Sequence, residues 1–281
     1  MTILTSADAE ALIADQGKDI IIPSIYTEIP YGAFEWSGLT SVVIPDGITK
    51  IGDWAFWDNE LTNVTIPDSV NSIGLYSFED NPITSIELGN GLASSQEGID
   101  WLPSSVRSIV FKDSVTNIGD HAFKDSKLTN VEFGENVSVI GDFSFRTNEL
   151  SSIDLSDNVI DIGDQAFAKN KLTSIEIPNK VTKIGDNAFS ENKLTSLKIG
   201  ESVDAIGRAA FESNSLTAVD IPDSVTTIGD LAFSINLLTS LEIGESVTTI
   251  GASAFEENNL EDVDIPDNVS TIGMRAFAYN K

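Results

Sequence analysis

The sequence predicts an α/β fold that leans to β-rich: a solenoid of stacked coils with a parallel sheet on one face and short helical turns on the other. Three observations predict it. A 22-residue unit repeats through the chain after Gly17, and its opening stretch alternates as a strand does. The remainder of each unit is long enough to return to a parallel neighbour, which a tight hairpin cannot reach. One coil cannot bury its apolar side alone, so the copies are expected to stack.

The cleanest copy of the unit runs over residues 172–193, and we number its positions from Leu172 as position 1. Pro178 is expected to end the strand because it cannot donate to a sheet ladder. Gly185 is expected to turn the chain in a backbone conformation that a side chain would penalise. Asp186 is expected to cap a single helical turn. The apolar positions, expected to face the core, are Leu172, Ile175, Ile177, Val181, Ile184, Ala188 and Phe189.

Stacking the copies turns equivalent residues into columns. A phenylalanine column is predicted in the core, with Trp101 as its substitute in the irregular copy: Phe34, Phe56, Phe78, Phe123, Phe145, Phe167, Phe189, Phe211, Phe233, Phe255 and Phe277. An asparagine column follows three residues later: Asn59, Asn81, Asn148, Asn170, Asn192, Asn214, Asn236, Asn258 and Asn280. Because an amide side chain both donates and accepts, we interpret the asparagines as structural links between coils.

The pattern LTSIxIPxxVxxIGxxAFxxN resembles the bacterial leucine-rich repeats of the BspA type, and the resemblance covers residues 17–281. It implies a right-handed leucine-rich-repeat solenoid with a parallel sheet on one face. It also implies a surface-exposed bacterial protein used for adhesion or partner binding, with no catalytic residues to carry across.

The predicted domain organisation is a capping helix over residues 1–16 and a solenoid of twelve coils over residues 17–281, with a continuous parallel sheet. The helix prediction rests on the Thr5-x-x-Asp8 start and the stop at Gly17. This segment lacks the basic start and long apolar run of a secretory signal peptide. The coil at 83–105 is irregular, and its segment after Leu92 is interpreted either as a decayed repeat with a surface bulge or as a functional loop.

Charge and composition narrow the possible functions. The chain has 16 basic and 44 acidic residues, a net charge of −28, no cysteine and one histidine. So acidic a chain repels phosphate backbones and anionic membranes, and no apolar run is long enough to span a bilayer, so we expect neither nucleic-acid binding nor membrane insertion. We found no pairing of nucleophile and base, metal-ligand cluster or phosphate loop, so the sequence predicts no enzyme, metal or cofactor.

Aromatic side chains form the first candidate binding surface. All four tryptophans lie in the first 101 residues, and Trp54 and Tyr76 share the position before the Ala-Phe step, which places them on one outer flank. Exposed aromatic rows can anchor a partner or stack on sugars. The alternative is that they pack over the end of the solenoid and the irregular coil. The candidate ligand-binding residues here are Trp54, Trp57, Tyr76 and Trp101.

An acidic column on the outer face of the strands is the second candidate surface: Glu132, Asp154, Glu176, Asp220, Glu242 and Asp264. Stacking brings these carboxylates within the Debye length of about 8 Å at physiological salt, where like charges destabilise. We favour a saline environment, in which dissolved ions would screen the repulsion between these carboxylates. Calcium is an alternative, because acids three residues apart recur where the strands end, and a basic or polyhydroxyl partner is another.

The sequence therefore favours a non-catalytic bacterial binding or adhesion module that presents its repeat surface to a protein or glycan partner. The resemblance implies a secreted or cell-surface location. The alternative function is a structural spacer or self-assembling element of a larger surface protein. End-to-end association is expected through the last coil, whose strand from Leu260 and whose Val263, Ile265 and Phe277 are predicted to be exposed.

Overall fold

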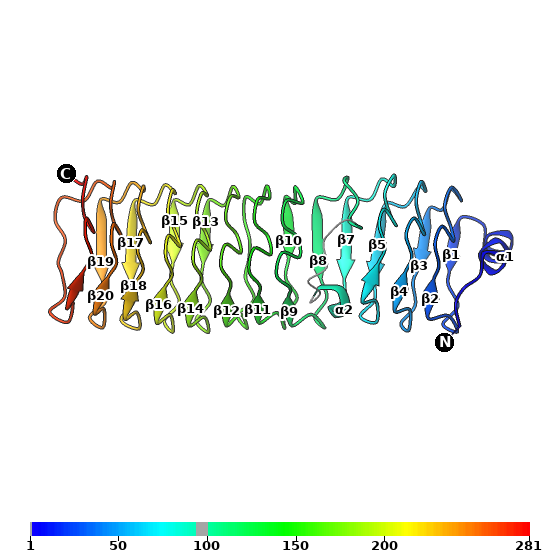
Figure 1. The fold of residues 1–281 in the computed structure, drawn as a ribbon, viewed down its shortest axis with the longest axis horizontal. Helices are drawn as coiled ribbons and strands as arrows, with labels where there is room; N and C mark the ends of the chain where they lie inside the picture. The colour runs from blue at the N-terminus through cyan, green and yellow to red at the C-terminus, as the bar shows by residue number, and fades with distance from the viewer. Residues whose placement is uncertain (1, 94–100) are drawn as a thin grey trace. The chain divides into compact units, whose positions relative to one another are not determined.

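The computed structural model describes residues 2–93 and 101–281, which form two compact units. Unit 1 comprises Met1–Thr116 with Ser126–Gly134, and unit 2 comprises Asn117–Asp125 with Glu135–Lys281. In each unit the strands of successive coils lie side by side and pair in parallel (Figure 1). The predicted fold class, a β-rich solenoid with parallel sheets, is confirmed. Each strand pairs with the equivalent strand of the next repeat, so that Ile184, for example, lies opposite Ile206.

Most coils carry two short strands, whereas the sequence predicts one. In unit 1 the first strands form a pair and a four-stranded sheet, and the second strands form a three-stranded sheet. The first strands are β1 (Asp19–Ile21), β3 (Ser41–Val43), β5 (Asn63–Ile66), β7 (Ser85–Leu88), β8 (Ser108–Phe111) and β10 (Asn130–Glu132). The second strands are β2 (Glu28–Ile29), β4 (Lys50–Ile51) and β6 (Ser72–Ile73).

In unit 2 the second strands form the continuous ladder, an eight-stranded sheet. Its members are β9 (Asn117–Ile118), β11 (Val139–Ile140), β12 (Asp161–Ile162), β14 (Lys183–Ile184), β16 (Ala205–Ile206), β18 (Thr227–Ile228), β20 (Thr249–Ile250) and β21 (Thr271–Ile272). The first strands form two separate pairs: β13 (Ser174–Glu176) with β15 (Ser196–Lys198), and β17 (Ala218–Ile221) with β19 (Ser240–Ile243). Residues 150–155 and 260–265 carry no strand. The expectation of one continuous sheet of first strands is therefore wrong in this unit.

The glycine after each second strand allows the coils to approach closely. A Cβ added to Gly185 would lie 2.5 Å from the carbonyl carbon of Gly163, the equivalent glycine of the preceding coil. Gly185 also donates its N–H to the carbonyl oxygen of Ile162 at 3.0 Å. Its φ is not in the left-handed region, so the predicted special conformation is wrong. The reason for glycine is the backbone of the neighbouring coil.

The segment after this glycine is a chain of hydrogen-bonded turns, and the predicted helical turn is wrong. The Ala188 N–H donates to the Gly185 carbonyl at 3.3 Å, and Asn187 between them has φ 57°. Asp186 does not cap a helix. Its N–H donates to the Asp164 carboxylate of the preceding coil at 2.7 Å. The left-handed residue turns its own side chain outward while Ala188 and the following phenylalanine remain buried.

The asparagine column links the coils through buried amides. Asn192 donates from Nδ2 to the carbonyls of Phe167 and Phe189 at 2.9 and 3.1 Å. Its Oδ1 accepts the Leu172 N–H at 3.0 Å. The same two donations to phenylalanine carbonyls recur at Asn59, Asn81, Asn148, Asn170, Asn214, Asn236, Asn258 and Asn280. The structural interpretation of this column is confirmed.

The phenylalanines stack along the core in both units. Phe167, Phe189 and Phe211 have ring centroids 5.4 and 5.5 Å apart, with interplanar angles of 12° and 2°. All seven apolar positions predicted from the copy at 172–193 are buried. Burying these rings and aliphatic chains provides the main stabilisation of the solenoid.

Helix α1 (Ser6–Gln16) begins and ends where the sequence predicts. Thr5 and Asp8 form a reciprocal capping box, and the hydroxyl of Thr5 holds the pKa of Asp8 below its usual value. Gly17 follows with φ 76° and donates its N–H to Ile13. The buried side chain of the helix is Ala9. The segment before the helix adds a bridge to β2, because the Leu4 N–H donates to the Glu28 carbonyl at 3.1 Å.

The irregular coil contains a second helix, α2 (Asn90–Ala93). The Asp68 carboxylate accepts hydrogen bonds from the N–H of Asn90 at 2.9 Å and from the hydroxyl of Ser114 at 2.6 Å. Both hydrogen bonds lower the pKa of Asp68, and the one from Ser114 has the larger effect. The predicted bulge or loop at 94–100 lies outside the described residues.

The last coil of unit 2 is more exposed than the coils before it. Ile272 is 50% exposed, whereas its partner in β20, Ile250, is fully buried. Ile265 is exposed as expected, and Val263 and Phe277 are half-buried. The expectation is wrong for Leu260, which is buried and donates its N–H to Asn280 at 3.0 Å. Association of this coil with another chain stays a prediction.

Replacing Asn192 with alanine is expected to lower the free energy of unfolding by about 3 kcal/mol, because the Leu172 N–H and the Phe167 and Phe189 carbonyls lose a buried partner. Urea unfolding followed by circular dichroism measures this cost. Asn187→Ala is the matched control, because Ala209 occupies the equivalent position of the next coil and only the preference of asparagine for φ 57° is lost, a cost of about 1 kcal/mol or less. Equal costs for the two variants would contradict the linking role of the column.

Replacing Ile235 with asparagine is expected to stabilise unit 2. Ile235 is exposed and has φ 55°, a conformation that costs a β-branched residue roughly 1 kcal/mol more than asparagine. Thermal unfolding measures the gain. Ile160→Asn is the control, because Ile160 is equally exposed but is absent from the left-handed residues. A gain in Ile160→Asn as large as in Ile235→Asn would show that reduced surface hydrophobicity, not backbone strain, is responsible.

Candidate binding surfaces

Five exposed or half-buried aromatic side chains gather on the turn edge of the first three coils in unit 1. We call this set the aromatic cluster: Tyr31, Trp36, Trp54, Trp57 and Tyr76. The centroids of Trp54 and Trp57 are 4.8 Å apart, and those of Trp36 and Trp57 are 5.1 Å apart. Tyr31 stacks on Trp54 at 6.3 Å, and Tyr76 meets Trp54 edge-on at 6.4 Å. The cluster is thus continuous across three coils.

Turn geometry explains why these rings point outward. Trp36, Trp54 and Tyr76 have φ values of 53°, 59° and 55° and occupy the two left-handed positions of the repeat, positions 16 and 20. Backbone hydrogen bonds between coils fix these turns, since the Trp36 N–H donates to the Trp57 carbonyl and the Trp54 N–H to the Leu75 carbonyl, both at 3.0 Å. Trp36 and Tyr76 are as a result 62% and 53% exposed, and Tyr31, at position 15 of the same turn, is 66% exposed.

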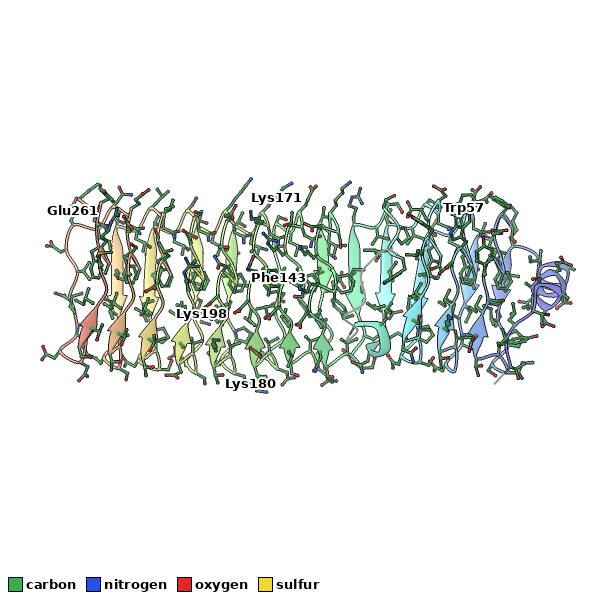
Figure 2. The ribbon with its side chains drawn as sticks, in the orientation of Figure 1. Trp57, Phe143, Lys171, Lys180, Lys198 and Glu261 are labelled. Carbon is green, nitrogen blue, oxygen red and sulfur yellow. The ribbon has the colours of Figure 1, made fainter. Side chains whose placement is uncertain are left out.

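The indole of Trp57 is held in place by a hydrogen bond. Its Nε1 donates to the Asp80 carboxylate of the next coil at 2.8 Å. Figure 2 shows Trp57 at the edge of its coil, among outward-pointing side chains. A ring that is fixed before binding loses less conformational freedom when a partner covers it.

Carboxylates surround the aromatic cluster. The turns that carry it, positions 15–22 of the first three coils, also carry Glu35, Asp53, Asp58, Glu60, Glu79 and Asp80. Four of these have structural partners: Asp53 accepts the Leu75 N–H, Asp80 the Trp57 indole, and Glu79 the hydroxyl of Ser104, while Glu60 lies 3.5 Å from Lys18. Among the described residues, Glu35 and Asp58 make no side-chain hydrogen bond or ion pair. The cluster is therefore an acidic aromatic surface.

The structure brings together three of the four predicted aromatic site residues. Trp54, Trp57 and Tyr76 lie in the cluster, whereas Trp101 is 5% exposed and does not line a surface. Assigning Trp101 to ligand binding is wrong, because it fills the core of the irregular coil. Tyr31 and Trp36 belong to the cluster but were not predicted. The sequence does contain a signal for them. Tyr31 and Trp36 are at positions 15 and 20 of their repeat, adjacent to positions 16 and 19, which Trp54 and Trp57 occupy in the next repeat.

The acidic column divides between the two units. In unit 1, Glu132 ends β10 and accepts a hydrogen bond from the Asn130 amide at 3.2 Å. In unit 2, Asp220 and Glu242 pair in register between β17 and β19 with their side chains exposed. Asp154 and Asp264 are exposed in the two stretches without a strand.

A lysine relieves part of the repulsion in unit 2. Lys198 lies beside Glu176 in the register of β13 and β15, and its ammonium forms an ion pair with that carboxylate. The hydrogen bond from Lys198 to Glu176 and the negative charge of Glu176 raise the pKa of Lys198. In Figure 2, Lys198 lies on the face of the coils, while Lys171 and Lys180 mark their opposite edges.

A shallow groove follows the ends of the first strands in unit 2. It is lined by Lys198, Glu201, Asp220, Asp223, Glu242 and Glu245 over Ile221 and Ile243. Within residues 2–93 and 101–281, no three acidic or histidine side chains are placed to hold a metal ion together. Neither described helix has the length and apolar content needed to cross a bilayer.

A family model described as the BspA type leucine-rich repeat region, in six copies, matches residues 11–99, 102–212 and 160–281. These ranges include nearly all of the chain, which therefore belongs to the BspA-type leucine-rich repeat family. The resemblance stated from the repeat pattern is confirmed. None of the curated proteins matches the chain.

Solved structures similar to this chain include three bacterial leucine-rich repeat proteins. A leucine-rich repeat protein of Eubacterium ventriosum is 20% identical, with 86% of this chain and 83% of that one covered and a TM-score of 0.45. One from Bacteroides ovatus is 19% identical, with coverages of 95% and 78% and a TM-score of 0.45. A leucine rich cell surface protein of Faecalibacterium prausnitzii is 20% identical, with coverages of 94% and 91% and a TM-score of 0.37.

Reversing one charge of the acidic column is expected to stabilise unit 2. Glu242→Lys places an ammonium opposite Asp220, reproducing the pairing of Lys198 with Glu176. The thermal midpoint should rise at low salt, and the gain should shrink as sodium chloride screens the charges. Glu176→Lys is the opposite control, because it sets two lysines side by side and should lower the midpoint. If both variants shift the midpoint in the same direction, register repulsion does not act on this face.

Proposed function

We propose that this chain is a non-catalytic binding module whose aromatic cluster holds a protein or glycan partner. The observation that carries the proposal is the exposure of several large rings on a rigid coil edge. Exposed, preorganised aromatic side chains are the residues that dominate binding free energy at interfaces. The hydrophobic effect alone would favour burying such rings, as it does for the phenylalanine column.

The surroundings of the cluster support a binding role over a catalytic one. The nearby carboxylates of Asp53, Glu79 and Asp80 accept hydrogen bonds that hold the turns and the Trp57 ring in place. Groups committed to fixing the backbone in this way are poorly suited to exchange protons with a substrate. We assign them a positioning role.

We propose a bacterial cell-surface location, which membership in the BspA-type repeat family supports. The acidic column is the second surface available to a partner in this setting, particularly a basic or polyhydroxyl one. The alternative role, a spacer or self-assembling element, predicts that changes on the coil faces leave function intact while changes in the last coil abolish it.

Arrays of immobilised glycans and peptides test the proposed function. The triple variant Trp36→Ser, Trp54→Ala, Trp57→Ser removes three rings with side chains that the repeat already accepts, as Ser213, Ala209 and Ser190 show at the same positions. Wild type is expected to retain at least one class of compound with a dissociation constant below about 100 μM, and the triple variant to lose at least tenfold.

Phe143→Ala is the matched control for these arrays, because it removes an aromatic ring from the same turn position in unit 2. It should bind as wild type does. Retention of all array ligands by the triple variant, or no retained compound with the folded wild type, would overturn the assignment of binding to the aromatic cluster. Circular dichroism melting confirms that each variant is folded.

A further inference from the structure

We propose that the aromatic cluster binds arginine side chains presented by an extended segment of a partner protein. This proposal rests on the proposed function, because it names the partner of the same surface. It follows from the angles between the rings, from the charge around them and from a contact that the chain itself makes elsewhere.

Most neighbouring rings of the cluster are steeply inclined to one another, whereas Tyr31 and Trp54 are inclined by 21°. Trp54 and Trp57 are inclined by 57°, Trp36 and Trp57 by 55°, and Trp54 and Tyr76 by 85°. A sugar ring stacks best on one flat platform, which the inclined rings of Trp36, Trp54, Trp57 and Tyr76 do not provide. A small planar guanidinium can contact the faces of two such inclined rings at once.

Charge around the rings favours a cation. The turns of the first three coils that carry the cluster contain six carboxylates, and Lys50 is the only lysine or arginine in residues 31–81. Glu35 and Asp58, which lack side-chain partners among the described residues, are placed to accept charge-assisted hydrogen bonds. The net charge of −28 attracts basic partners over longer distances.

The last coil shows this chemistry within the chain. The guanidinium of Arg275, at position 16, lies over the ring of Tyr279, at position 20, with 5.1 Å between Cζ and the ring centroid. Arg275 also forms an ion pair with Glu256 of the preceding coil. Arginine at this turn position can therefore satisfy an aromatic ring and a carboxylate together.

The first coil has the same ring position without the arginine. Trp36 occupies position 20, and position 16 is Gly32, which has φ 58° and no side chain. The Glu35 carboxylate lies 3.2 Å from where a Cβ of Gly32 would be. The first coil thus has a ring at position 20 and a carboxylate beside position 16, where glycine supplies no side chain. An arginine from outside the chain supplies the guanidinium that Arg275 supplies in the last coil, with Glu35 of the same coil in the place of Glu256 of the preceding one.

Binding is measured with a capped peptide in which three arginines alternate with glycine. Trp36, Trp54 and Trp57 are three of the four tryptophans, so their fluorescence reports on the cluster directly. We expect a dissociation constant of about 100 μM or tighter at low salt, at least tenfold weaker binding of the matched citrulline peptide, and weaker binding of the lysine peptide. Cellohexaose, a neutral glycan, should not bind.

Two substitutions at Gly32 distinguish arginine binding at this position from non-specific attraction of a basic peptide to the acidic chain. Gly32→Arg supplies the guanidinium from within the chain and should weaken peptide binding at least tenfold. Gly32→Ser should leave it within about threefold, since Ser253 and Arg275 both occupy this turn position with similar φ values of 55° and 63°. Phe143→Ala should bind as wild type does.

Several results overturn the proposal. They are failure to bind the arginine peptide, equal binding of the citrulline peptide, an unchanged affinity in Gly32→Arg, or full binding by the Trp36, Trp54 and Trp57 triple variant. If cellohexaose or an array ligand binds through the tryptophans while the arginine peptide does not, the arginine proposal fails and the binding function stands. If no ligand depends on these rings, both fail.

Discussion

The close stacking of one coil on the next is the constraint on which the rest of the structure depends. At Gly185 the backbone of the preceding coil lies where a side chain would begin, and at Asn192 one amide joins the backbones of neighbouring coils. Between them the phenylalanine rings stack at about 5.4 Å. These contacts demand the same residue at the same place in each repeat, because a change in one coil affects both neighbours.

Close stacking also determines where the chain is free to vary. Each coil must turn between the glycine and the asparagine, and it does so with two residues in the left-handed conformation, such as Asn187 and Glu191. Their backbone N–H groups donate to the next coil whatever side chain they carry. Residues as different as Trp54, Ala209 and Leu231 therefore occupy position 16. The turn edge is where the repeat can acquire a binding surface without losing a structural contact.

The repeat pattern predicted the core and the links between coils. Phenylalanines at fixed spacing are best buried together, and asparagines at fixed spacing can both donate and accept hydrogen bonds between coils. It also placed Trp54 and Tyr76 on one flank. The second strand was missed because a two-residue strand such as Lys183–Ile184 shows no alternation. The turn was mistaken for a helical one because its positive φ values fall on ordinary residues, which rarely adopt them.

The remaining errors have a common cause. Trp101 was assigned both to the core and to a surface, since the lost repeat pattern around it gave no register from which to choose. Tyr31 and Trp36 were missed because neither occupies the same position as Trp54, and their proximity depends on the outward direction of the turns. Columns of like residues are thus visible in the sequence, whereas clusters that combine positions 15, 16, 19 and 20 require the turn geometry.

The distribution of charge supports assigning recognition to the turn edge of the first coils. On the strand face, a favourable cation is already supplied by the chain where Lys198 meets Glu176, and in the last coil where Arg275 meets Glu256. Around the aromatic cluster, Lys18 contacts Glu60 alone, and Glu35 and Asp58 remain without such a partner among the described residues. Carboxylates beside exposed rings gain most from a cation that also covers the rings, because excluding water strengthens both the ionic and the aromatic contact. The proposed basic partner would therefore meet two features of this edge together, the exposed rings and the carboxylates of Glu35 and Asp58.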